Sequence, residues 1–262
     1  MRDILREIIA HKRNEITVQK DSMPYSLLER ELADCHSSVY SLKDALLQSG
    51  TGIIAEFKRR SPSRGWINQH ANAGNVTKGY EVAGATALSV LTDSTYFGGT
   101  LADLQHAARQ AKIPVIRKEF IIDEYQILQA RLSGASAILL IAAALSIEET
   151  HRFIRLSKQL GLEVLLELHD EKEIEYTSPE TTIIGINNRN LGTFVTDLKK
   201  SYRMVELLPR DAVWVSESGI SNPETVKELR QAGYRGFLIG ENFMRTADPG
   251  VSLEEFIKEV LQ

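Results

Sequence analysis

The sequence contains a single cysteine, Cys35. One thiol can form neither a disulfide within the chain nor a cysteine-rich metal site, so the composition suits a reducing compartment and gives no indication of a metal. The motifs H-E-x-x-H, paired C-x-x-C and G-x-S-x-G are also absent from the sequence. Zinc hydrolysis, α/β-hydrolase chemistry and thiol redox reactions therefore have no residues to work with.

Long apolar runs and an excess of positive charge are lacking as well. The longest apolar run, 137–145, spans about nine residues, whereas a membrane helix needs about 20. The amino-terminal segment has no continuous apolar core of the signal-peptide kind, and its Asp3, Glu7 and Glu15 are unusual for a transit peptide. The formal net charge of −4 argues against a surface for nucleic acid, because such a surface normally needs clustered excess Lys and Arg. We expect a mature cytoplasmic protein with no nucleic-acid or membrane partner.

Helical patterns occupy the first part of the chain. Apolar residues at helical spacing predict an amphipathic helix that packs on its own domain: Ile4, Leu5, Ile8 and Ile9. A second helix is expected to begin near Pro24, because proline suits the first helical turn. A third is expected to run from Ser41, which can cap with Asp44, to Gly50. Residues 1–48 therefore form a helical extension before the first strand.

Eight short apolar runs follow, each separated from the next by polar or glycine-bearing residues and an amphipathic stretch such as 123–132 or 223–232. The runs are 52–58, 86–92, 113–120, 136–142, 162–169, 182–189, 212–218 and 235–240. Eight βα units suit a closed barrel of typically ~250 residues. An open doubly wound sheet usually carries a glycine fingerprint, and the sequence has neither G-x-G-x-x-G nor a Walker loop. We predict one domain, 1–262: an α/β, (β/α)8 TIM barrel with 1–48 as an integral helical extension.

Charged residues gather where the predicted strands end. Because strand side chains alternate, Glu56 and Lys58 share the face of Ile54, and Lys118 shares the face of Ile116. The same ends carry further polar residues: Ser61, Glu167, Asn187, Arg189, Glu217 and Ser218. The active site of such a barrel lies at the carboxyl ends of its strands. A single lysine or glutamate here is equally consistent with a structural ion pair, but this concentration at one rim suggests a ligand or chemistry.

Glycines follow the last two predicted strands, where many barrels bind phosphate. Gly219 and Gly240, with the backbone amides around Glu241, are each as consistent with a plain turn as with an anion site, but together they favour phosphate. Phe97 precedes a glycine pair and is either an apolar wall of the site or loop packing. His169 has no partner in the sequence, and we expect it behind the site or at the surface.

Six motifs, in this order and at these intervals, resemble those of indole-3-glycerol phosphate synthase: IIAEFKRRSPS, RKEFIIDEYQI, LLELH, GINNRNL, SESGI and LIGENFM. The resemblance runs from the amino-terminal helices to the last strand. It implies closure of the indole ring of 1-(2-carboxyphenylamino)-1-deoxyribulose 5-phosphate with loss of carbon dioxide and water, in tryptophan biosynthesis and without a cofactor. It also implies that the amino-terminal helices help to cover the site.

The resemblance assigns catalytic roles to two pairs of residues. Lys118 would be the general acid of ring closure with Glu167 as its partner, and Glu56 and Lys58 would serve the dehydration. Burial beside other cations is expected to lower the pKa of such a lysine toward the working pH. Glu119 stands where aspartate is common in the family, and we expect it on the helix side with little effect.

The resemblance also assigns the substrate contacts. Asn187, Glu217 and Ser218 would meet polar groups of the substrate, Ser61 its carboxylate, and Arg189 its charge or position. Apolar contacts would come from Phe97, Phe120 and Leu191. The phosphate would lie near Lys58, Gly219, Gly240 and Glu241, with the side chain of Glu241 turned away. The expected partner is a phosphorylated small molecule; we expect a monomer, with association with other enzymes of the pathway left open.

Two other functions are compatible with a phosphate-binding barrel. Phosphoribosylanthranilate isomerase works with a cysteine and an aspartate at the barrel mouth, whereas Cys35 lies in the helical extension. A non-catalytic barrel that binds a phosphorylated ligand would have no need of both Lys118 and Glu167.

Overall fold

The computed structural model describes residues 4–33 and 40–262, so Cys35 lies outside the described residues. Eight parallel strands close into a barrel in the order β1-β10-β9-β8-β7-β6-β5-β4. This arrangement confirms the predicted barrel, and each of the eight predicted apolar runs supplies one strand. The strands are β1 (Ile53–Phe57), β4 (Ala87–Leu91), β5 (Val115–Lys118), β6 (Ala137–Ile141), β7 (Glu163–Leu168), β8 (Ile183–Asn187), β9 (Val213–Glu217) and β10 (Gly236–Ile239). A short hairpin of β2 (Arg60–Ser61) and β3 (Gly65–Trp66) rises from the end of β1.

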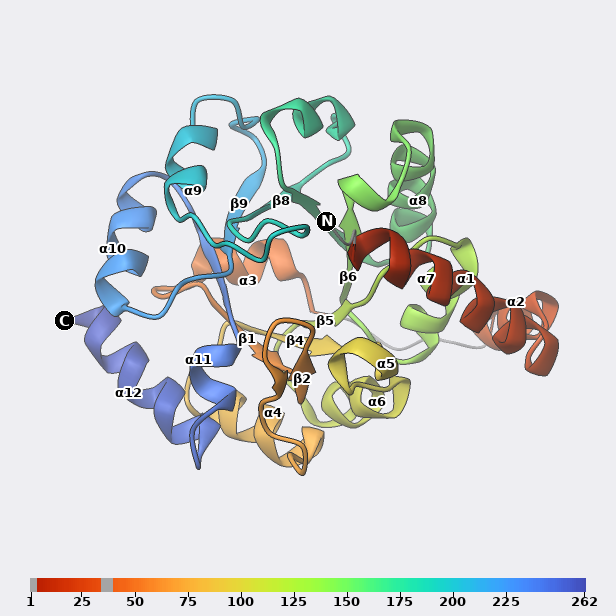
Figure 1. The fold of residues 1–262 in the computed structure, drawn as a ribbon, viewed down its shortest axis with the longest axis horizontal. Coiled ribbons are helices and arrows are strands. Elements are labelled where there is room, and N and C mark those ends of the chain that lie inside the picture. The colour runs from red at the N-terminus through yellow and green to blue at the C-terminus, as the bar shows by residue number, and fades with distance from the viewer. Residues whose placement is uncertain (1–3, 34–39) are drawn as a thin grey trace.

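Helices surround the barrel (Figure 1). They are α1 (Ile4–Ser22), α2 (Tyr25–Ala33), α3 (Leu42–Gln48), α4 (Ala73–Val82), α5 (Ser94–Phe97), α6 (Leu101–Gln110), α7 (Glu124–Leu132), α8 (Ile147–Gln159), α9 (Lys199–Met204), α10 (Pro223–Gln231), α11 (Glu241–Met244) and α12 (Pro249–Leu261), with 3-10 helices η1 (Ala142–Ala144) and η2 (Glu171–Tyr176). In the described residues, no helix is both long and apolar enough to cross a membrane.

One connection departs from the predicted alternation of strands and amphipathic helices. Between β7 and β8 the chain forms only the 3-10 helix η2. The segment is short, and Pro179 follows Ser178 in its second half, where a proline ring would interrupt a longer helix. The outer layer is therefore thinnest beside β7 and β8.

Two apolar layers hold the barrel together. The outer layer packs strand residues such as Phe57, Leu140 and Ile186 against the surrounding helices. The inner layer fills the barrel with side chains of opposite parity, including Ile54, Ile116 and Leu165. This division confirms the strand faces predicted from alternation, and it directs Glu56, Lys118 and Glu167 into the barrel.

Helix α3 closes the amino-terminal end of the barrel. Its Leu42 and Leu46 are fully buried in the inner apolar layer. Ser41 caps the helix by accepting from the Asp44 backbone N–H, as predicted. Glu163, at the start of β7, accepts hydrogen bonds from the Ser41 hydroxyl and from the backbone N–H groups of Leu42 and Lys43. The predicted extension thus supplies one end of the core.

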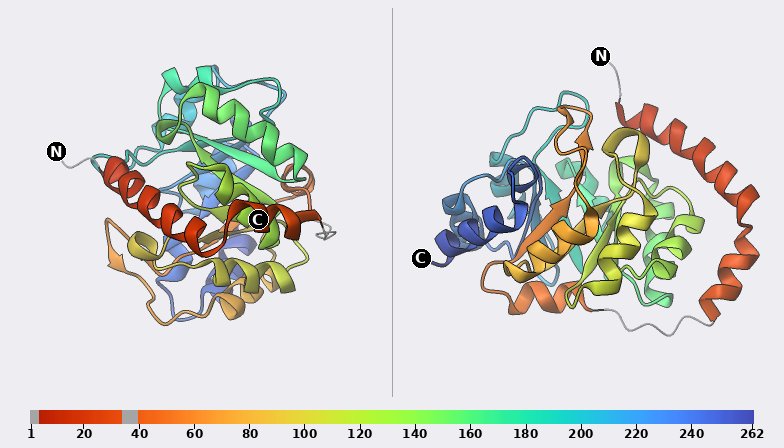
Figure 2. Two further views of the ribbon diagram at one scale, coloured as in Figure 1. Left: turned by 90° about the vertical axis from the view of Figure 1, so that its right-hand side faces the viewer. Right: turned by 90° about the horizontal axis from the view of Figure 1, so that it is seen from below.

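Helix α1 begins over the opposite end of the barrel and descends along its side. Figure 1 shows α1 beginning beside β6 and running outward across α7 to α2, and the right-hand view of Figure 2 shows it leading from the mouth down to α2 on the outside. Leu5 and Ile8 belong to the inner apolar layer, whereas Ile16 packs with Leu28 of α2 and Leu128 of α7. The amphipathic helix predicted at the start of the chain is confirmed.

Candidate active site

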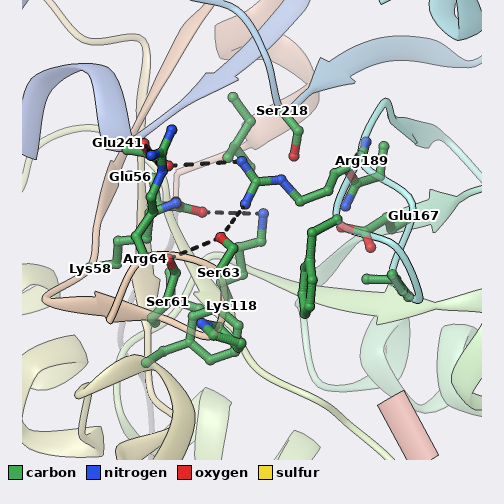
Figure 3. A pocket seen from close by; sticks show the side chains of 18 of the residues that line it. Glu56, Lys58, Ser61, Ser63, Arg64, Lys118, Glu167, Arg189, Ser218 and Glu241 are labelled. Atoms are coloured by element: carbon green, nitrogen blue, oxygen red, sulfur yellow. Dashed lines mark hydrogen bonds and ion pairs between the residues drawn. The ribbon is translucent and has the colours of Figure 1, made fainter. Parts of the chain in front are cut away.

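A cavity of about 380 Å³ opens at the carboxyl ends of the strands. Figure 3 shows side chains that line it and labels the charged ones around its floor and mouth. All but one of the predicted site residues line it: Glu56, Lys58, Ser61, Phe97, Lys118, Phe120, Glu167, Asn187, Arg189, Leu191, Ser218, Gly219, Gly240 and Glu241. The exception is Glu217, which is fully buried and lies behind Lys118. Parallel strands that end at one rim bring these distant sequence positions together.

Lys118, the last residue of β5, lies between the acidic side chains of Glu217 and Glu56. Its Nζ lies 3.0 Å from Glu217 Oε2 and 3.2 Å from Glu56 Oε2. Burial alone would lower the pKa of Lys118, but the charges of Glu217, Glu56 and Glu167 raise it above its usual value. The expectation that its pKa falls toward the working pH is therefore wrong, because the neighbours that dominate are carboxylates rather than cations. Lys118 is a protonated ammonium group throughout the neutral range.

Glu56 joins Lys118 to the second predicted lysine. Lys58 Nζ lies 2.6 Å from Glu56 Oε1. Burial raises the pKa of Glu56, but Lys58 and Lys118 more than offset this and bring it to about 2. A Cβ at Gly240, the residue after β10, would overlap with the Glu56 carboxylate. Glycine at this position therefore leaves the space that the carboxylate occupies.

Glu217 has the opposite titration behaviour. Complete burial and the nearby charge of Glu167 raise its pKa well above the usual carboxyl range, although Lys118 opposes the shift. Gly185 of β8 makes room for this side chain, because a Cβ there would overlap with Glu217 Oε1. Behind the cavity, Glu217 thus keeps its proton at pH values at which Glu56 and Glu167 are ionised.

Glu167, at the inner face of β7, lies beside a histidine that the sequence reasoning placed behind the site or at the surface. His169 Nε2 is 3.1 Å from Glu167 Oε1, although the ring is not aligned for a regular hydrogen bond. Burial raises the pKa of Glu167, but His169 and Lys118 lower it, and the net shift is downward. His169 directly follows β7, two residues after Glu167, and this spacing in the predicted run 162–169 was the sequence signal for the contact.

One wall of the cavity is apolar. Phe97, the last residue of α5, faces Phe120 with ring centroids 5.9 Å apart, and Leu191 lies nearby in the same inner layer. Phe97 is thus part of the site rather than loop packing alone. Three residues of α1 complete the wall, and sequence reasoning assigned none of them to the site individually: Ile4, Leu5 and Ile8.

Ionic contacts cross the mouth of the cavity. Arg189 donates to Ser63 Oγ at 2.9 Å and lies 3.8 Å from Glu241 Oε2. Arg64 of the β2–β3 hairpin lies 3.2 Å from Glu241 Oε1. Figure 3 shows Arg189 extended between Ser63 and Glu241. The hairpin, the loop after β8 and α11 are therefore joined above the cavity, through Ser63 and Arg64, which the sequence reasoning did not single out.

The chain turns sharply directly after β9, beside the cavity. Ser218 adopts a left-handed φ of 67° and Gly219 a φ of 80°. This conformation is uncommon for serine, and the Asn188 amide secures it by donating to the Ser218 carbonyl at 3.2 Å. A Cβ at Gly219 would overlap with Thr196. Within residues 4–33 and 40–262, no cluster of three or more His, Cys, Asp or Glu side chains could hold a metal ion.

Comparison with known proteins adds independent information. The family model described as indole-3-glycerol phosphate synthase matches residues 5–256. The enzyme of that name from Bacteroides thetaiotaomicron is 53% identical over 260 residues, covering 99% of this chain and 100% of the relative. The one from Burkholderia vietnamiensis is 41% identical over 256 residues, covering 97% and 98%.

A solved structure shares the fold at low identity. In the tryptophan synthase α2β2 complex of Pyrococcus furiosus, one chain superposes with a TM-score of 0.61 at 13% identity, covering 80% of this chain and 98% of that one. The family model matches nearly the whole chain, and the two relatives match it over almost their full lengths. These matches identify a family, whereas the shared fold at 13% identity identifies the fold alone. The chain belongs to the indole-3-glycerol phosphate synthase family.

Proposed function

We propose that this cavity closes the indole ring of 1-(2-carboxyphenylamino)-1-deoxyribulose 5-phosphate, with loss of carbon dioxide and water, as a carbon–carbon lyase of the carboxy-lyase type. One observation carries the proposal: Lys118 is a buried ammonium group held between Glu56 and Glu217, and Glu56 is also paired with Lys58. Ring closure and dehydration each need a proton donor and a group that balances charge, and this cluster contains both kinds of group twice.

Lys118 acts as the acid in ring closure. Attack of the aromatic carbon on the ketone builds negative charge on the carbonyl oxygen, and a buried ammonium group can stabilise that charge by donating a proton. The raised pKa keeps Lys118 protonated until the oxygen needs the proton. Glu167 faces the same space as a carboxylate and balances the positive charge that develops on the ring system.

Glu56 and Lys58 serve the dehydration. After carbon dioxide leaves, the hydroxyl must depart with a proton, and a neighbouring proton must be removed. Lys58 is the donor and Glu56, with a pKa near 2, is the ionised acceptor. Their contact at 2.6 Å allows the proton to pass between them once the product has left.

The cavity also orients the substrate. Its aromatic ring lies against Phe97, Phe120 and Leu191, which offer the apolar surface. The phosphate lies toward Gly219, Gly240 and the first turn of α11, where Glu241 supplies its backbone and Lys58 supplies charge. The remaining polar contacts fall to the residues that line the space between: Ser61, Asn187, Arg189 and Ser218, with Glu217 behind them.

The reaction is proposed to require no cofactor and to take place in the cytoplasm. We further propose that the chain works as a monomer and as one domain, because α3 fills the end of the barrel and α1 covers its mouth. Association with other enzymes of tryptophan biosynthesis is compatible with this arrangement.

Indole fluorescence tests the proposal. Mixing the purified chain with 1-(2-carboxyphenylamino)-1-deoxyribulose 5-phosphate should produce the indole signal, and a chelator should not change it. Lys118→Ala should lower turnover by at least ~100-fold while substrate binding is largely kept, because a positioned acid contributes that much. Lys78→Ala, at an exposed lysine of α4, serves as the control.

Binding without product in the wild-type protein would contradict the synthase activity and would favour a phosphate-ligand barrel without catalysis. An unchanged rate constant in Lys118→Ala would remove Lys118 from the mechanism while leaving the activity itself intact.

A further inference from the structure

Helix α1 carries a charged residue inside its apolar face. Lys12 is only 1% exposed, and it follows Leu5 and Ile8 at the spacing that places all three on one side of the helix. Leu5 and Ile8 enter the wall of the cavity, whereas Lys12 does not line the cavity. The helix face that covers the site therefore continues into a buried ionic cluster beside it.

Three carboxylates surround the Lys12 ammonium group. Its Nζ lies 2.9 Å from Asp93 Oδ2, 3.1 Å from Glu119 Oε1 and 2.9 Å from Glu15 Oε2. Asp93 and Glu119 are as deeply buried as Lys12 itself. Burial alone would lower the pKa of Lys12, but Glu119 and Asp93 reverse the shift and raise it. Loss of the Lys12 cation would therefore leave Asp93 and Glu119 buried without the ammonium group that they share.

Each buried carboxylate also holds a piece of the active site. Asp93 caps α5 by accepting from the Tyr96 N–H at 2.6 Å, and the last residue of that helix is Phe97. Glu119 directly follows Lys118 and accepts from the N–H of Phe120 at 2.9 Å. Lys12 thus contacts the two carboxylates that hold the backbone of α5, which ends at Phe97, and the backbone of Phe120.

Other contacts place α1 on the same two strand ends. The His11 ring approaches Thr95 Oγ1 at 3.0 Å and packs edge-on against Tyr96, so α1 and α5 meet over more than one turn. Glu119 is further fixed by the Thr92 hydroxyl at 2.7 Å and by the buried Arg117 at 3.7 Å. The Glu119 carboxylate therefore joins the end of β5 to the lysine of α1.

A buried ion pair is weak evidence for a gain in stability, because desolvation of the charges offsets much of their attraction. An apolar side chain at position 12 would pack α1 against the barrel without fixing its register. A cation between two directed carboxylates, in contrast, defines one position of the helix along the strand ends.

We propose that Lys12 is a positioning residue for the reaction: it locks α1 onto the ends of β4 and β5 and so sets the aromatic wall and Lys118 in register. This inference rests on the function proposed above. It assigns Lys12 no contact with the substrate, and it predicts that catalysis depends on a residue of the helical extension that lies outside the cavity.

The test compares two lysines of the same helix. Lys12→Met removes the buried charge. Lys20→Met is the matched control, because the Lys20 side chain is 39% exposed and forms an ion pair with Asp123. In folded protein, Lys12→Met should lower kcat/KM by about 10- to 100-fold, since small misplacements of catalytic groups have effects of this size. Lys20→Met should stay within about twofold of the wild type.

Amide hydrogen exchange gives a readout independent of turnover. The N–H groups of Tyr96 and Phe120 donate to Asp93 and Glu119, so their exchange should accelerate in Lys12→Met and not in Lys20→Met. If Lys12→Met does not fold, Glu119→Gln replaces it. This variant keeps the Lys12–Asp93 pair, and it should show the same changes with smaller amplitude.

A merely structural role would lower the melting temperature of Lys12→Met while kcat, KM and the exchange of these two amides stay at wild-type values, and that result would overturn the proposal. Failure of the proposed function is a separate outcome, because the wild-type protein would then make no indole product. In that event the exchange of the Tyr96 and Phe120 amides still decides the role of Lys12.

Discussion

Glu167 lines the cavity and Glu217 is buried behind it, and their pKa values move in opposite directions. In the folded protein Glu217 holds its proton at pH values at which the unfolded chain, with a pKa near 4.5, has already released it. The folded state then binds more protons than the unfolded state, so stability falls as pH rises from 4.5 through the raised pKa.

Glu217→Gln should remove this fall, because glutamine resembles the protonated side chain and cannot ionise. The melting temperatures of the variant and the wild type should agree near pH 4.5, and the variant should be higher by at least about 2–4 °C at pH 8. Scanning calorimetry at several pH values would measure the difference, with the exposed Glu259→Gln as control. A difference independent of pH would show that Glu217 is ionised in the folded protein.

Strand alternation predicted where the candidate site residues lie, but it did not predict their pKa values or their ion-pair partners. Strand parity placed Glu56, Lys118 and Glu167 in the barrel, because one-dimensional alternation decides the face of a strand side chain. It failed for the pKa of Lys118 and missed the contact of His169 with Glu167, since both depend on partners from other strands or on exact side-chain directions. The role of Lys12 could not be predicted for the same reason, because two of its three carboxylate partners, Asp93 and Glu119, are distant in the sequence.

The β2–β3 hairpin, the loop after β8 and α11 meet through one carboxylate. Glu241 forms ion pairs with Arg64 and Arg189 at the end of the cavity where we place the phosphate. A bound phosphate and the Glu241 side chain would compete for the same two guanidinium groups. The local charge of these elements, rather than the net charge of the chain, therefore sets the affinity for an anion.

Glu241→Gln should tighten the binding of inorganic phosphate by about two- to fivefold, because it frees both arginines while keeping the backbone of α11. Isothermal titration calorimetry at low ionic strength would measure it. Glu254→Gln, which breaks an exposed ion pair with Lys258 on α12, should have no effect. Weaker phosphate binding in Glu241→Gln would place the anion elsewhere in the cavity.

The starts of several helices have a local signal in the sequence, namely a capping residue or a proline in the first turn. Ser41 and Asp123 cap their helices, and Pro223 begins α10. The β7–β8 connection was harder, because a short segment rich in polar residues resembles the start of a helix until its length and Pro179 are considered. The pairing of loops across the mouth has no local signal at all.

The helical extension belongs to the core of the whole molecule. Leu46 is fully buried at the closed end of the barrel, whereas the adjacent Leu47 is 52% exposed. Leu46→Ala should lower the free energy of unfolding by about 2–5 kcal/mol, as large-to-small core substitutions do. Leu47→Ala should change it by about 0.5 kcal/mol or less. Urea denaturation would compare them, and equal values would mean that α3 is dispensable to the barrel.

The closed barrel could be predicted from the sequence, because eight successive apolar runs of this kind fit few other arrangements. The barrel closes where β1 pairs with β10, with Ile53 opposite Phe237. During synthesis on the ribosome, β1 therefore has an open edge until nearly the whole chain has emerged, and Glu56 lacks the Gly240 backbone beside it. A nascent chain that stops before β10 already contains Glu56, Lys118 and Glu217, but the edges of β1 and β9 stay unpaired and the barrel stays open until β10 is added.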